Sequence, residues 1–165
     1  MSYKIRTLCR STLPATVPLI IGLLTPAGVV LGLNIFVRGQ PLVSAITDPC
    51  KGPFAGDMCC WHPFFLGFTL IPFIALSILS WLASKQITHA RVILIELFGL
   101  LGILAVTIPA HISVWYPLYG GGHMSSTAVI AFVFIPFVAI GGMALGIFVG
   151  WLVSLLPPLR KSDKV

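Results

Sequence analysis

The stretch VILIELFGLLGILAVTIPAHISVW, residues 92 to 115, decides the fold, because it is the only long apolar run of this chain that contains ionisable side chains. About 20 residues of α-helix cross the hydrocarbon core of a bilayer, so a run of this length predicts a transmembrane helix. Its one carboxylate, Glu96, then lies in or near lipid. A charged group there is costly without a partner, so an intramembrane acid indicates a candidate functional site.

Glu96 shares one face of this predicted helix with two further polar residues. At about 100° per residue, Thr107 falls about 20° and His111 about 60° from the direction of Glu96. We expect this intramembrane polar stripe to face protein. Arg91 is a poor partner, since five residues place it about 140° round the helix from Glu96. Two arrangements stay open: Glu96 points into the bundle toward another span, or it leans back to the interface and stays ionised.

The composition predicts an all-α integral membrane protein with a single membrane domain over residues 1–165. Hydrophobic residues make up 58% of the chain, charged residues only 8%, and the mean hydropathy is +1.05. Soluble domains contain about 25% charged residues. The net charge of +6 would suggest nucleic acid in a soluble chain. Here the basic residues flank apolar runs, which indicates membrane topology and no nucleic-acid partner.

Four apolar runs predict a four-transmembrane-helix bundle with spans at about 15–37, 63–83, 92–115 and 127–156. The first run is longer than the about 7 to 15 apolar residues of a cleavable signal, so we expect a retained anchor. Residues 38–62 form a loop rich in Pro and Gly, expected on the non-cytoplasmic side.

The distribution of basic residues predicts the orientation of these spans. On the side of the termini lie Lys4, Arg6, Arg10, Lys85, Arg91, Arg160, Lys161 and Lys164, whereas only Arg38 and Lys51 lie on the other side. By the positive-inside rule both termini are cytoplasmic. We expect a multi-pass protein of a plasma or inner membrane.

Small residues repeat at helical spacing in two of the predicted spans. One row is Gly28 and Gly32, and the other is Gly142, Gly146 and Gly150. Such rows let helix backbones approach closely where lipid offers little hydrophobic drive. We expect both rows to pack helices within this bundle or against a partner subunit. Each span also contains proline, which indicates kinked packing or, alternatively, a flexing bundle.

Three of the four cysteines, Cys50, Cys59 and Cys60, fall in the loop predicted to face the oxidising side. They predict one structural disulfide from Cys50 to Cys59 or to Cys60, closing a loop of about ten residues. The alternative is redox chemistry, in which the vicinal pair exchanges with a partner thiol and passes electrons to a quinone. The chain lacks the Cys-x-x-Cys pair that such enzymes usually use.

Three histidines, His62, His111 and His123, fall near the same outer face. Imidazole nitrogen is a ligand for zinc, copper and haem iron. The spacing matches no metal motif, so we predict no metal site and expect histidines hydrogen-bonded to backbone or water. A haem or pigment bound at His111 is the alternative.

Common enzyme signatures are absent: there is no Gly-rich phosphate loop, no HExxH, no nucleophile elbow and no pair of intramembrane acids. No internal repeat indicates an autonomous transporter either. We therefore expect a non-enzymatic four-helix membrane subunit, or an accessory or assembly factor of a larger membrane protein complex, with other integral membrane subunits and the lipid bilayer as partners. The alternative is a small membrane oxidoreductase or proton-handling protein that uses Glu96, His111 and the loop cysteines with quinone or haem. The sequence identifies no catalytic residue and no cofactor, and leaves lipid, quinone, haem or pigment open.

Overall fold

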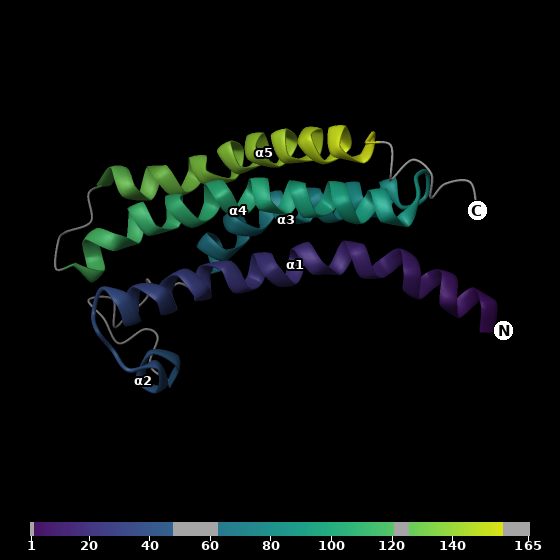
Figure 1. Ribbon diagram of the computed structural model, residues 1–165. Helices are drawn as coiled ribbons and strands as arrows, with labels where there is room; N and C mark the ends of the chain where they lie inside the picture. Colours follow the sequence, from purple (N-terminus) through teal and green to yellow (C-terminus); the bar gives the residue numbers. More distant parts are fainter. Residues whose placement is uncertain (1, 48–62, 121–125, 157–165) are drawn as a thin grey trace.

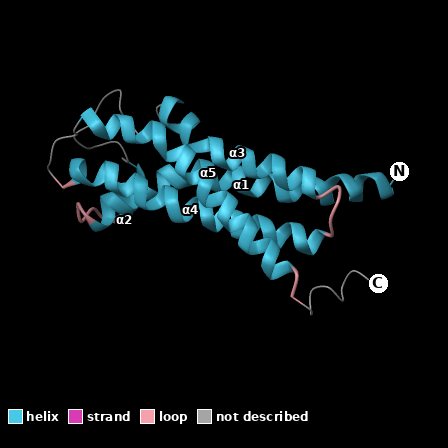
Figure 2. Ribbon diagram, turned by 90° about the horizontal axis from the view of Figure 1, so that it is seen from above, coloured by secondary structure: helices cyan, strands magenta, loops and turns pink. Residues whose placement is uncertain are grey.

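The computed structural model describes residues 2–47, 63–120 and 126–156, and all regular structure in these ranges is helical (Figures 1 and 2). The helices are α1 Ser2–Phe36, α2 Leu42–Thr47, α3 Pro63–Ala83, α4 His89–Tyr119 and α5 Ser126–Ser154. The prediction of an all-α protein is therefore confirmed for the part of the chain that the structure describes.

Three of these helices are long and apolar enough to cross a membrane: Ala15–Phe36 within α1, His89–Pro117 within α4 and Phe132–Ser154 within α5. In α3 the described apolar stretch, Gly67–Ala83, is shorter. The chain thus has the helices of a membrane protein in a lipid bilayer, with three candidate spans and a fourth, shorter apolar helix beside them.

The helix ends differ from the limits of the apolar runs. The first helix begins at Ser2 rather than near residue 15, α4 extends the expected 92–115 at both ends, and α2 lies within the expected loop 38–62. Hydropathy marks where a chain meets lipid, whereas a helix continues until a stop signal ends it. After α1 that signal is Gly39, whose φ of 64° turns the chain while Gln40 N donates to the Asn34 carbonyl oxygen at 3.1 Å.

The long helices form one elongated bundle. In Figure 1, α4 and α5 lie side by side, and α1 follows the opposite side of α3 and α4. The start of α1, the link from α3 to α4 and the end of α5 lie at one end of the bundle; α2 lies at the other.

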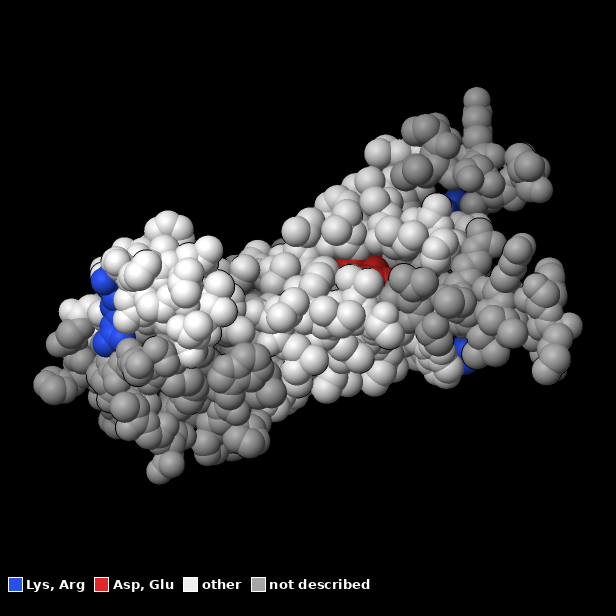
Figure 3. Space-filling model, turned by 90° about the horizontal axis from the view of Figure 1, so that it is seen from below, with Lys and Arg blue, Asp and Glu red and all other residues white. Residues whose placement is uncertain are grey.

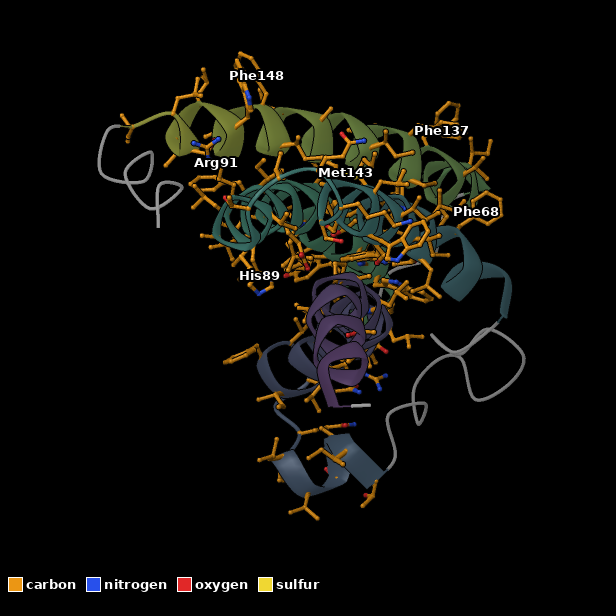
Figure 4. The ribbon with its side chains drawn as sticks, turned by 90° about the vertical axis from the view of Figure 1, so that its right-hand side faces the viewer. Phe68, His89, Arg91, Phe137, Met143 and Phe148 are labelled. Carbon is orange, nitrogen blue, oxygen red and sulfur yellow. The ribbon has the colours of Figure 1, made fainter. Side chains whose placement is uncertain are left out.

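Two apolar clusters form the core along the bundle axis. The cluster nearer α2 draws on α1, α4 and α5 and consists of Val29, Leu33, Val114, Trp115, Phe132 and Ile135. The second cluster draws on α3, α4 and α5 and consists of Phe73, Leu76, Leu100, Ile103, Ala139 and Met143. In Figure 4, Met143 lies on the side of α5 that faces α4.

The glycines of α5 bring its backbone against that of α4. A Cβ added at Gly142 would lie 2.5 Å from the Gly102 carbonyl oxygen, and one at Gly150 would lie 3.0 Å from Ile95 Cα. At Gly146 the nearest atom would be the Phe98 carbonyl oxygen, closer still. These three glycines therefore lie inside the bundle, at a contact between backbones that any larger residue would disturb.

The glycine row of α1, Gly28 and Gly32, has open space beside it. A Cβ added at either residue would meet no atom within 4 Å. These two glycines pack against no other helix of the described chain.

Cations stand over aromatic rings at both ends of the bundle. Lys85 Nζ lies 3.4 Å from the ring centroid of Trp81, and Arg38 Cζ lies 5.2 Å from that of Tyr119. On the face shown in Figure 3, the Lys and Arg atoms drawn in blue lie at the two ends and none lies along the middle. Charges and aromatic rings so placed are typical of the two interfaces of a membrane.

Candidate functional site

The polar stripe of α4 is buried in the bundle. Glu96 is 7% exposed, His111 is 2% exposed and Thr107 is fully buried. Apolar neighbours at the same helical spacing, Val92 and Ile103, are buried with them. One face of α4 therefore carries both core side chains and polar groups, and the polar groups contact protein.

Glu96 contacts α3 through its carboxyl group. The side chain of Ser80 forms a hydrogen bond with it, whereas Oε2 has no hydrogen-bond partner among the described residues. Glu96 is the only acidic residue in the described ranges, and Figure 3 shows one small acidic patch on an otherwise uncharged middle surface. In Figure 4, Arg91 lies on the α5 side of α4 and His89 points to the opposite side.

His111 is enclosed by α3 and α5. Its Nε2 lies 3.3 Å from Thr69 Oγ1, and its ring meets the Phe132 ring edge-on with 5.5 Å between centroids. Its Nδ1 is buried, with no hydrogen-bond partner among the described residues. Each imidazole nitrogen can accept or donate one hydrogen bond, depending on its protonation. Of the titratable side chains described, His111 is the most deeply buried.

The hydrogen bond seen for Thr107 among the described residues is a local one. Its hydroxyl donates to the Ile103 carbonyl oxygen one turn earlier, at 2.9 Å. Threonine commonly satisfies its hydroxyl in this way inside a helix. Thr107 therefore does not connect Glu96 to His111 through a hydrogen bond.

Glu96 and His111 belong to two separate sites. Fifteen residues of helix place their backbones about 22 Å apart. Between them lies the apolar cluster of α3, α4 and α5, including Leu76, Leu100 and Ile103. Because α3 and α4 run in opposite directions, the later α3 residue, Ser80, forms a hydrogen bond with Glu96 near the start of α4. The earlier α3 residue, Thr69, forms one with His111 near the end of α4. The described residues provide two polar pairs and no continuous polar chain between them.

Several buried polar residues were not identified from the sequence. They are Thr69, Ser77 and Ser80 on α3 and Asn34 on α1, with exposures of 3%, 5%, 5% and 0%. The α3 residues recur at intervals of eight and three, which is a helical face. That spacing could have identified the face of α3, because hydroxyls among apolar residues indicate the side turned away from lipid. Asn34, an amide near the end of an apolar run, is a similar signal.

The remaining candidate residues lie outside the described residues: Cys50, Cys59, Cys60, His62 and His123. Within the described ranges no group of three or more His, Cys, Asp or Glu side chains could hold a metal ion. Comparison of the chain with protein-family models, with curated proteins and with solved structures finds no match.

Proposed function

We propose that this chain is a non-enzymatic four-helix membrane subunit, or an accessory or assembly factor, of a larger membrane protein complex. In this proposal α3 is the fourth span, both termini are cytoplasmic, and Cys50 pairs with Cys59 or Cys60 on the other side. The supporting observation is the small share of each span that the bundle itself buries. Of the most apolar windows of the three long helices, only 28 to 33% is buried inside the chain.

The outward face of α5 is the surface we assign to the partner. At intervals of three and four residues it exposes Phe134, Phe137, Gly141, Leu145 and Phe148. Figure 4 shows Phe137 and Phe148 pointing away from the bundle. Aromatic side chains around a small residue suit a second apolar helix, because rings add contact area while glycine permits close approach.

The separation of the two polar sites supports this reading over a proton-handling enzyme. Acid–base chemistry along the bundle would use Glu96 and His111 together, and about 22 Å of helix rise separates them. Each side chain is instead held by one hydroxyl from α3. Such pairs fix the register of two helices, which is a structural task.

The test is purification of the tagged full chain in mild detergent. We expect a particle larger than the 17.7 kDa chain, containing a second integral membrane protein in fixed ratio. Gly141→Leu should remove that protein while the chain itself stays folded, because a Cβ at Gly141 meets no atom within 4 Å. Gly67→Leu is the matched control, since Gly67 is also exposed and equally free of contacts.

Two results would contradict the proposal. One is a stable, monodisperse single chain without any companion protein. The other is a purified chain that oxidises thiols or carries an absorbing quinone, haem or pigment in stoichiometric amount, which would favour the oxidoreductase alternative.

A further inference from the structure

A groove of about 530 Å³ runs along the outer surface between α1 and α4. Gly28 and Gly32 line it from α1, and Ile108 and Ile112 line it from α4. The hollow exists because the two glycines leave open space where other residues would place side chains. It faces outward, since Gly28, Ile108 and Ile112 are exposed.

The lining of the groove selects an apolar occupant. Its polar members are Thr25 and Tyr116 at opposite ends. The Thr25 hydroxyl already donates to the Ile21 carbonyl oxygen at 2.7 Å. The inner end and middle of the groove therefore offer hydrocarbon contact and little else.

The length of the groove matches one leaflet of a bilayer. From Thr25 to Phe36 it follows twelve residues of α1, or about 18 Å of helix rise. One leaflet contributes about half of a hydrocarbon core of roughly 30 Å. A single acyl chain lying along α1 therefore has the right extent to run from the middle of the membrane to its edge.

A positive charge lies next to the outer end of the groove. Arg38 follows Val37, the lining residue directly after α1, and its guanidinium stands over the ring of Tyr119. Tyr116, one turn before Tyr119, lines the groove itself. Guanidinium groups bind phosphate well, and tyrosine favours the interface where lipid phosphates lie.

The helix α2 supports placing the Arg38 end of the groove at the edge of the membrane. It lies beside the Arg38 end of α1, and its side chains Leu42, Val43 and Ile46 are exposed by more than half. A short apolar segment on the surface is expected at the boundary between headgroups and hydrocarbon.

We propose that the groove binds one glycerophospholipid, with an acyl chain along Gly28 and Gly32 and the phosphate at Arg38. The competing occupant is a transmembrane helix of a partner. A phospholipid uses both the apolar length of the groove and the positive charge of Arg38 next to its outer end, whereas an apolar helix would use only the apolar length.

The experiment is photo-crosslinking of the full chain, with its native companions, in phosphatidylcholine vesicles that contain phosphatidylglycerol with a diazirine on its acyl chain. Adducts mapped by peptide mass spectrometry should concentrate on residues 25–37 and 108–116. Gly32→Leu places a side chain in the groove at a position where a Cβ meets no protein atom within 4 Å. It should lower these adducts about tenfold, because the acyl chain would then be overpacked against leucine. Arg38→Gln should lower them about fivefold, the effect of one basic residue near a membrane surface.

Gly67→Leu is the matched control, because a Cβ at Gly67 also meets no atom within 4 Å and Gly67 lies on α3, which contributes no residue to the groove. It should leave the groove adducts unchanged. Equal adducts in the wild type and in Gly32→Leu would overturn the proposal, as would adducts spread evenly over all helices. Loss of a companion protein from Gly32→Leu with unchanged adducts would assign the groove to a helix instead.

Discussion

Replacing either of two adjacent glycines of α5 by alanine should change the free energy of unfolding, in opposite directions at the two positions. Gly142 faces α4, and a Cβ there would lie 2.5 Å from the Gly102 carbonyl oxygen and 2.9 Å from Val106 Cγ2. Gly141 faces outward, and a Cβ there would meet nothing within 4 Å. Replacing each by alanine therefore tests the packing of α4 against α5 without a change of chemistry.

The magnitude follows from the distances. Ordinary van der Waals contact begins at 3.4 Å, so Gly142→Ala is 0.9 Å too close to a backbone oxygen that no rotamer change can move. The helices must separate, and overpacking of this kind lowers the free energy of unfolding by about 1 to 3 kcal/mol. Gly141→Ala should raise it by about 0.5 to 1 kcal/mol, because alanine loses less conformational entropy in a helix than glycine does.

Reversible unfolding in mixed detergent micelles, followed by circular dichroism and tryptophan fluorescence, measures both values in the same assay. We expect the two variants to differ by about 1.5 to 4 kcal/mol, which is more than tenfold in the unfolding equilibrium. Equal stabilities, or a larger loss from Gly141→Ala, would refute the close packing of α4 on α5.

Three further predictions concern polar side chains. Glu96→Gln keeps a group that can hydrogen-bond Ser80 and should change the free energy of unfolding by less than about 1 kcal/mol; a loss of several kcal/mol in the micelle assay would show that the carboxylate charge is required. Thr69→Val removes the hydroxyl beside His111 Nε2 and should lower the free energy of unfolding by about 0.6 to 2 kcal/mol, whereas Thr69→Ser keeps the hydroxyl and should not. Equal free energies of unfolding for the two variants would contradict a stabilising hydrogen bond between Thr69 and His111. Cys50→Ser should lower stability by about 2 to 4 kcal/mol if Cys50 forms the expected disulfide, and thiol labelling of all three loop cysteines without reductant would show that no disulfide forms.

The sequence predicts the helices better than their ends. Apolar length alone identified the helices now seen as α1, α3, α4 and α5, because lipid requires satisfied backbone groups and a helix satisfies them locally. It did not predict that α1 begins at Ser2, since the basic residues before 15 are good helix formers that continue an existing helix outside lipid. It also missed α2, whose six residues are too few to give a periodic signal.

For the candidate site, the sequence predicts the positions of the polar residues on α4 but not their partners on α3. The angular positions of Glu96, Thr107 and His111 depend only on the 100° step of one helix, so they could be worked out before any packing was known. Their neighbours Ser80 and Thr69 depend on which helix lies against α4 and in which register. That choice is made by tertiary contacts such as the α5 glycines against Gly102, which a single sequence does not specify.

The paired cations and aromatic rings at the two ends of the bundle have a consequence for where the protein can reside. From His89 to Tyr119, α4 rises about 45 Å, close to the roughly 40 to 45 Å of a bilayer with its headgroups. With Lys85 and Trp81 at one end and Arg38 and Tyr119 at the other, we expect an anchor in each headgroup layer. In a thinner bilayer both anchors would reach their layers only if the bundle tilts or the lipids around it stretch, so we expect the free energy of insertion to depend on membrane thickness.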